Sequence, residues 1–158
     1  MALLKVGAHA PDFHLPSLEG GSITLHELLG EGPVVLAFFK VNCPVCQLAF
    51  PFLERIHRGR KPGALSVHGV SQNSARATEE FNREYGVTFT TLLDPEDSFD
   101  ASNAYGISYV PTLFLVGRDQ KIAWSLEGFH RKQLDWLGRQ AEVTVFRPGE
   151  RVPESKGG

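Results

Sequence analysis

Apolar and polar positions along the chain alternate between runs typical of buried strands and stretches with helical spacing. The uninterrupted apolar run from Val34 to Phe39 lies between turn residues, and its length and composition predict a strand buried on both faces. In residues 46–58, apolar side chains recur at helical spacing around an internal Pro51. These patterns predict a central strand, a tight turn and a helix in direct succession.

The same alternation continues toward the C-terminus. Further strands are predicted over residues 65–70, 90–94, 112–116 and 121–125, and further helices over 75–85, 98–105 and 130–141. Gly86 and Gly106 follow two of these helices at the position where a glycine commonly ends a helix. Residues 117–120 separate the last two strands and predict a hairpin. Strands that alternate with helices and end in a hairpin predict an α/β sandwich with a mixed sheet.

Length and composition agree with one folded domain. The 158 residues are 42% hydrophobic, and the formal net charge is −2 without a dense basic cluster, so no nucleic-acid partner is expected. Residues 1–146 carry the predicted elements and form the expected domain. Residues 147–158 contain almost nothing apolar and are expected to form a flexible C-terminal tail.

Neither a membrane span nor a secretory signal is visible in the sequence. The longest apolar run, Val34 to Phe39, is far shorter than the roughly 20 residues that a membrane-spanning helix needs, so no membrane partner is expected. Met1 to Lys5 lack the basic and apolar regions of a signal peptide. We therefore expect a cytoplasmic protein, with an extracytoplasmic location left open for a trimmed sequence. We also expect a monomer or a weak dimer.

The two cysteines, Cys43 and Cys46, are the most informative residues of the chain. If Cys43 caps the predicted helix, Pro44 takes the first helical position, where its missing N–H costs nothing. The amides that follow can then point at the Cys43 sulfur, and the helix dipole favours its thiolate form. Cys43 is therefore the candidate nucleophile. Cys46, one helical turn further along, is the candidate resolving thiol.

A Cys-x-x-Cys pair also occurs as half of a zinc site. Such a site needs two further ligands, and the chain has no second cysteine pair, although His26, His57 and His68 are available in principle. Haem attachment needs a histidine directly after the second cysteine, where this chain has Gln47. An inert pair of buried thiols is the remaining alternative, and the position between strand and helix argues against it. We expect no metal and no other cofactor.

Several segments together resemble the redoxin branch of the thioredoxin superfamily, which includes the AhpC/TSA and TlpA-like proteins. The matching segments are Ala10-Pro11-Asp12-Phe13, Phe38 to Cys46, Pro51 and Tyr105 to Thr112. The resemblance extends from Val6 to Gly128. It implies a thioredoxin-like three-layer sandwich, with a mixed central sheet and helices on both faces, and a dithiol/disulfide active site.

The resemblance also implies a set of substrate-binding residues around the cysteines. In similar proteins the peptide bond that corresponds to Val110-Pro111 is cis, and the residue before the proline offers backbone hydrogen bonds to an extended substrate segment. Asn42, which stands where a tryptophan is common, and Pro44 complete the expected set. The alternative for Pro111 is that it only begins an edge strand.

Two carboxylates of similar proteins are missing from this chain. Thioredoxins carry a buried carboxylate where the chain has Ala37, and TlpA-like proteins often carry a glutamate where it has Ala49. Lys40 lies three residues before Cys43 and is the nearest ionisable residue in the sequence. It is the candidate stabiliser of the Cys43 thiolate. The alternative is a solvated lysine at the end of the strand.

Thiol–disulfide exchange is the favoured function, with Cys43 attacking a protein or small-molecule disulfide and Cys46 resolving the product. A peroxiredoxin-type thiol peroxidase is an alternative with Cys46 as the peroxidatic cysteine. Similar peroxiredoxins carry a Pro-x-x-x-Thr-x-x-Cys motif that ends at the peroxidatic cysteine, and an arginine on a later strand. Against this alternative, the chain has Phe39 and Cys43 in place of the proline and threonine, and Pro111 in place of the arginine. A copper-handling module of the Sco type is a third reading. Its cysteines are one residue further apart than these, and His130 is only a loose match to its distant histidine.

Overall fold

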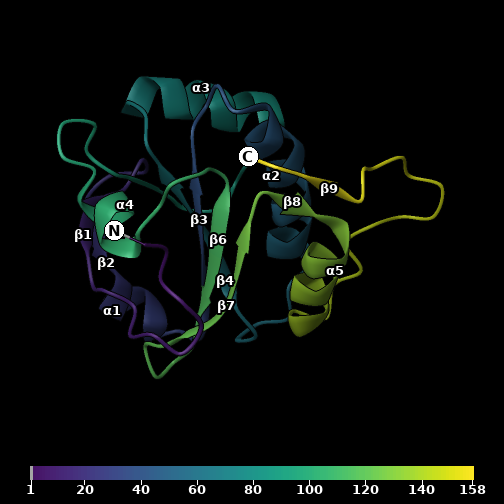
Figure 1. Ribbon diagram of the computed structural model, residues 1–158, viewed down its shortest axis with the longest axis horizontal. Coiled ribbons are helices and arrows are strands. Elements are labelled where there is room, and N and C mark those ends of the chain that lie inside the picture. The colour runs from purple at the N-terminus through teal and green to yellow at the C-terminus, as the bar shows by residue number, and fades with distance from the viewer. Residues whose placement is uncertain (1) are drawn as a thin grey trace.

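The computed structural model describes residues 2–158, which form a five-stranded sheet between two layers of helices (Figure 1). The strands are β1 (His14–Pro16), β2 (Ser22–Thr24), β3 (Val34–Phe39), β4 (Ser66–Ser71), β5 (Thr91–Leu93), β6 (Thr112–Val116), β7 (Ile122–Glu127), β8 (Phe129–His130) and β9 (Ser155–Lys156). The helices are α1 (Leu25–Leu29), α2 (Pro44–Gly59), α3 (Ala75–Tyr85), α4 (Asp100–Tyr105) and α5 (Arg131–Gln140).

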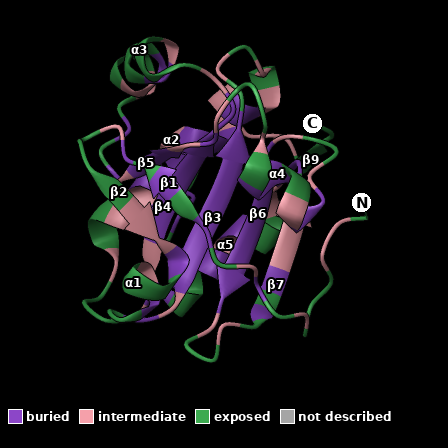
Figure 2. Ribbon diagram, turned by 90° about the vertical axis from the view of Figure 1, so that its left-hand side faces the viewer, coloured by how far each residue is buried: buried purple, intermediate pink, exposed green. Residues whose placement is uncertain are grey.

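The large sheet has the strand order β5-β4-β3-β6-β7. Strands β3, β4 and β5 run parallel to one another, whereas β6 is antiparallel to β3 and β7 is antiparallel to β6. Strand β3 is central and buried along its whole length (Figure 2). The predicted α/β sandwich with a mixed sheet is therefore confirmed.

Side chains of β3 alternate between two hydrophobic cores, as the pleat of a strand requires. Its odd-numbered residues enter a core that also contains Phe50 of α2, Phe81 of α3 and Leu134 of α5. Its even-numbered residues enter a second core with Leu25 of α1 and Tyr105 of α4. A strand that feeds both cores is buried on both faces, which explains its continuous apolar run and gives the molecule its three layers.

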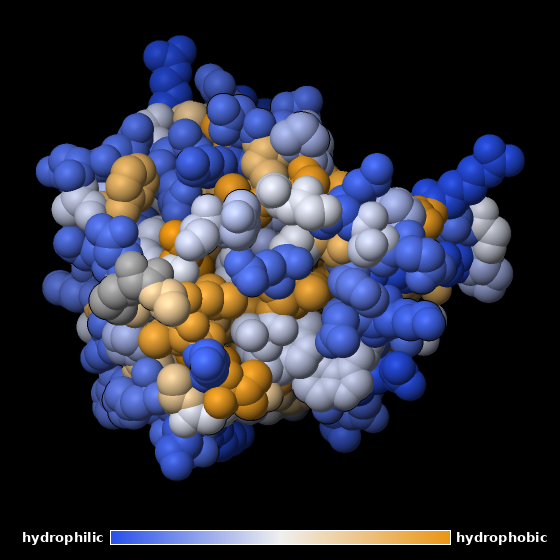
Figure 3. Space-filling model, viewed as in Figure 1, coloured by the Kyte–Doolittle hydropathy of each residue, from blue (hydrophilic) through white to orange (hydrophobic). Residues whose placement is uncertain are grey.

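Three short N-terminal elements were not predicted from the sequence. Strands β1 and β2 form an antiparallel pair. Helix α1 follows directly and begins with a capping box, in which the Thr24 hydroxyl accepts from the N–H of Glu27 and the Glu27 carboxylate accepts from the N–H of Thr24. The residues before β1 run beside β7, where the Gly7 N–H donates to the carbonyl of Ile122 at 2.8 Å. In the same view as Figure 1, Figure 3 shows an apolar area on the side of the molecule where the N-terminal segment lies.

The C-terminal segment, residues 147–158, ends against the body of the protein. Its strand β9 pairs antiparallel with β8, with Lys156 opposite Phe129 and Ser155 opposite His130. The flexibility expected for this segment from its composition stays a prediction. Among residues 2–158, no helix is long and apolar enough to cross a membrane.

Candidate active site

Cys43 lies in the turn between β3 and α2 and is the N-cap residue of α2. Its backbone is extended, with φ −100° and ψ 112°, and Pro44 takes the first helical position. The N–H of Cys46 donates a hydrogen bond to Cys43 Sγ at 3.1 Å. The predicted capping geometry is confirmed, and it directs a helix amide and the positive end of the helix dipole at this sulfur.

Cys46 lies on the first turn of α2 and is fully buried, whereas Cys43 is partly exposed. Both thiols are free, so the site is in its dithiol state. Cys46 belongs to the same apolar core as Ala49 and Phe50. Burial, and to a smaller extent the hydrogen bond with Cys43, raise the pKa of the Cys46 thiol above its ordinary value. Cys46 therefore keeps its proton at neutral pH.

The turn before β6 brings Val110 and Pro111 to the cysteines. Because β6 is antiparallel to β3, with Thr112 opposite Phe38, the start of β6 and the end of β3 lie at the same edge of the sheet. The Val110-Pro111 peptide bond is cis, as the resemblance implied. The Cys43 thiol donates to the carbonyl oxygen of Val110 at 3.5 Å. The sheet thus joins the reactive thiol to the backbone that was expected to bind substrate.

Hydrogen bonds from two side chains that sequence reasoning missed hold the cysteine turn. The Val41 N–H donates to Asn73 Oδ1 at 2.9 Å, and Gln47 Nε2 donates to the Val41 carbonyl at 3.0 Å. Asn73 follows β4, thirty-two residues away from Val41 in the sequence. Only the parallel pairing of β3 with β4 brings the two together, so no local sequence pattern signals this contact.

The other expected site residues lie at the rim of this turn. Asn42 and Pro44 are exposed on either side of Cys43. Lys40 is exposed at the end of β3 and lines a hollow of about 190 Å³, which also borders Val110 and the buried Gln72. The structure therefore brings Lys40 beside the turn before β6, and its role toward the Cys43 thiolate stays a prediction.

The two positions that carry carboxylates in similar proteins hold alanines in this chain. Ala37 and Ala49 are both buried, at 0% and 1% exposure. Glu54 is a buried acid on α2, but it accepts hydrogen bonds from the N–H and the hydroxyl of Thr88 and from Arg58. Burial acts to raise the pKa of Glu54, and these hydrogen bonds outweigh it and hold the pKa below its ordinary value. Glu54 is thus a structural carboxylate.

A mixed sheet of this topology, with paired thiols at the start of α2 and a cis-proline turn facing them, defines a thioredoxin-like thiol–disulfide oxidoreductase. Residues 6–125 match the AhpC/TSA family. The chain belongs to this family.

The names of similar proteins point to the same enzyme class. The chain is 33% identical over 122 residues to the thiol-disulfide oxidoreductase ResA of Halalkalibacterium halodurans, covering 77% of this chain and 68% of that protein. It is 30% identical over 150 residues to ResA of Bacillus subtilis, covering 93% of this chain and 79% of the relative. Among solved structures, a putative thiol:disulfide interchange protein DsbE from Chlorobium tepidum superposes with a TM-score of 0.76 at 27% identity, covering 87% of this chain and 95% of that one.

Proposed function

We propose that Cys43 is the nucleophile and Cys46 the resolving thiol of this thiol–disulfide oxidoreductase. The observation that carries this assignment is the contrast between the two thiols. Cys43 is partly exposed and accepts a helix N–H, while Cys46 is buried behind it. A substrate disulfide reaches Cys43 first, and only a group already inside the protein reaches Cys46.

The reaction follows from this order. The Cys43 thiolate attacks one sulfur of a substrate disulfide, a Cys43–substrate disulfide forms, and the other substrate sulfur leaves and takes up a proton. The Cys46 sulfur, after losing its proton, attacks Cys43 Sγ and releases the second substrate thiol. Two electrons and two protons pass to the substrate, and the enzyme ends with a Cys43–Cys46 disulfide. A reduced partner reverses these steps.

The substrate-binding part of the proposal rests on Val110 and Pro111. The Val110 carbonyl accepts the Cys43 thiol hydrogen in the free enzyme, so it lies next to the position of an incoming sulfur. Backbone groups so close to the nucleophile can hold an extended substrate segment by strand addition. Asn42 and Pro44 form the neighbouring exposed rim and contact the partner on the side of α2.

Trapping of the mixed disulfide tests the order of the two thiols. Cys46→Ser should accumulate a covalent adduct with an oxidised peptide, because nothing resolves the first product. Cys43→Ser is the matched control and should accumulate none. Adducts of equal yield in both variants, measured by mass spectrometry without reductant, would defeat the ordered mechanism.

Neither alternative function is favoured. A peroxiredoxin mechanism would need Cys46 as the peroxidatic residue, yet Cys46 is fully buried. Phe39 and Pro111, which stand where similar peroxiredoxins have the motif proline and the later-strand arginine, are also buried. For the copper-handling alternative, no three His, Cys, Asp or Glu side chains within residues 2–158 lie close enough to share a metal ion.

The substrates are protein or small-molecule disulfides and dithiols, and the cytoplasmic location and the oligomeric state stay predictions.

A further inference from the structure

The last residues of the chain lie against the substrate-binding side of the active site. A methyl group built on Gly158 would overlap the carbonyl oxygen of Val110, the same atom that accepts the Cys43 thiol. A methyl group on Gly128, beside Pro111, would come within 2.5 Å of the Lys156 carbonyl oxygen. Backbone therefore packs directly on backbone here. In Figure 1 the C-terminus ends beside the start of α2.

Backbone contacts hold this segment along β8. Strand β9 pairs with β8, and the Arg131 N–H donates to the Glu154 carbonyl at 2.9 Å. Further back, Nη1 and Nη2 of Arg55 donate to the Glu150 carboxylate, at 2.8 and 2.6 Å. The ion pair between Arg55 and Glu150 anchors the segment to α2, and the residues after Glu150 extend to the active site.

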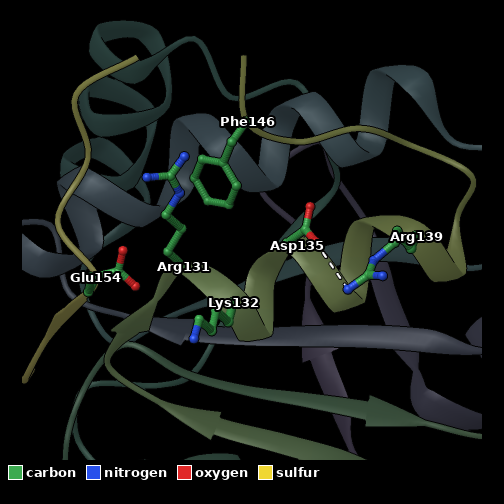
Figure 4. Close-up of a pocket in the computed structure, with 6 residues that line it drawn as sticks. All are labelled: Arg131, Lys132, Asp135, Arg139, Phe146 and Glu154. Atoms are coloured by element: carbon green, nitrogen blue, oxygen red, sulfur yellow. Dashed lines mark ion pairs between the residues drawn. The ribbon is translucent and has the colours of Figure 1, made fainter. Parts of the chain in front are cut away.

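Side-chain packing adds little to these contacts. Residues 154–158 are exposed, and their side chains are small or charged. Between the segment and α5 lies a hollow of about 440 Å³ with Glu154 on one wall (Figure 4). Among the charged residues of α5 that line it, Arg131 lies over the Phe146 ring and Arg139 pairs with Asp135. A segment held by a few exchangeable backbone hydrogen bonds can be displaced by another extended chain.

We propose that residues 155–158 are an internal occupant of the surface formed by Val110, Gly128 and β8, and that an extended polypeptide substrate displaces them before it reacts at Cys43. This inference rests on the proposed function of Cys43. Small disulfides need no strand-like contact and react without displacing the segment. The segment therefore slows polypeptide substrates selectively.

The contact geometry also indicates what kind of polypeptide fits. The backbone of Gly158 approaches Val110 so closely that no β-carbon fits at that position. Next to it, Tyr109, Glu127 and the two last glycines border a hollow of about 220 Å³, large enough for a neighbouring side chain. The favoured partner is an extended segment with a glycine opposite Val110.

Two glycine variants provide a matched test. Gly158→Val should push the segment away, because the new side chain overlaps the Val110 carbonyl. Gly157→Val is the control, because a β-carbon at Gly157 meets no atom within 4 Å. Release is measured by hydrogen exchange of the Arg131 amide, which loses its acceptor on Glu154. Activity is measured as the rate of reduction of an oxidised glycine-containing peptide and of bis(2-hydroxyethyl) disulfide.

We expect Gly158→Val to speed exchange of the Arg131 amide and to raise the peptide rate severalfold, with the small-disulfide rate unchanged and Gly157→Val like the wild type. Unchanged exchange in Gly158→Val would overturn the proposal, since the contact with Val110 would then not hold the segment. Faster exchange without a gain for the peptide, or an equal gain for both disulfides, would overturn it as well. Failure of the wild type to reduce either disulfide would instead overturn the proposed function.

Discussion

Cys43 and Cys46 are three residues apart, yet the helix start gives them different chemistry. Cys43 accepts a helix N–H and is partly open to solvent, whereas burial makes the Cys46 thiol hold its proton more tightly. The difference arises from position alone, because the side chains are identical. A change that moved the start of α2 by one residue would remove it.

Selective alkylation is the first expected consequence. A brief, limiting dose of iodoacetamide on the reduced protein should modify Cys43 and leave Cys46 unmodified, since Cys46 is fully buried. Peptide mapping by mass spectrometry locates the modified residue. Preferential labelling of Cys46 would reverse the assignment of the nucleophile.

A second expected consequence is that the rate of the resolving step depends on pH. Because the pKa of Cys46 is raised, its thiolate fraction increases with pH from neutrality upward, and the decay of a preformed Cys43 mixed disulfide should accelerate accordingly. Ala49→Glu should speed this decay severalfold near neutral pH by adding a carboxylate to the same buried core.

Ala49→Gln is the control for the altered packing in that experiment, since it has the same shape without the base. Stopped-flow measurement across pH follows the decay. A wild-type rate already independent of pH from about pH 6 upward would show that another base serves Cys46, and Lys40 would be the first residue to replace.

Sequence reasoning at this scale found the residues whose chemistry is local. The cap at Cys43 and Pro44 after it follow from the strand and helix patterns around them. Asn73 and Gln47 were missed because their hydrogen bonds to Val41 depend on how two chain segments meet in space. The same reason hid the contact of Gly158 with Val110.

Helix α4 is the element that leads into the turn before β6, and a buried carboxylate fixes its start. Asp94, which is 1% exposed, accepts hydrogen bonds from the N–H groups of Ala101 and Ser102 at 3.0 and 2.8 Å. The side chain of the N-cap residue Phe99 accepts no hydrogen bond from the helix, so the Asp94 carboxylate caps the helix in its place.

Removing this carboxylate should destabilise the protein. Asp94→Ala leaves two helix N–H groups without an acceptor and should lower the free energy of unfolding by about 2–4 kcal/mol. Asp97→Ala, at an exposed position in the same loop, should change it by less than about 0.5 kcal/mol. Urea unfolding of the three proteins measures the difference, and equal midpoints would contradict the role of Asp94.

Most of the elements that could be predicted are long enough to show a period, and the three-residue β5 was found from its short apolar and β-branched run. The run that became β3 and the helix closed by Gly86 were found within a residue or two. Strands β1, β2, β8 and β9 have two or three residues each, too few for any alternation to be visible. Their existence depends on pairing with partners, and β9 in particular has no apolar residue to mark it.

Stability of the whole molecule should depend on pH through a histidine in the sheet. His68 on β4 is buried, its Nε2 lies 2.8 Å from Ser66 Oγ, and its Nδ1 has no hydrogen-bond partner among residues 2–158. Burial, and then the charges of His57 and Arg60, lower the pKa of His68 from 6.5 to about 4. Between these values the unfolded chain binds a proton that the folded protein does not.

Acidification should therefore unfold the protein more readily in that window. Above pH 6.5 the His68 side chain does not lower the free energy of unfolding. As the pH falls from 6.5 to 4, protonation of His68 in the unfolded chain lowers this free energy by roughly 3 kcal/mol. The lowered pKa of His57 acts in the same direction. His68→Gln should flatten the curve of unfolding free energy against pH, measured with urea from about pH 7 to about pH 4.5. An unchanged slope would show that His68 does not titrate on unfolding.

The pairing of β3 with β6 also separates the residues that hold the site together from the residues that surround it. The Cys43 sulfur and the Val110 carbonyl lie beside the ends of two neighbouring strands of the sheet, whereas the side chains of Asn42, Pro44 and Tyr109 are exposed. Substitution at these exposed positions alters the surface offered to a partner without changing a residue of either hydrophobic core. Under the proposed function, the choice of partner can therefore be altered at these positions while the folding frame stays the same.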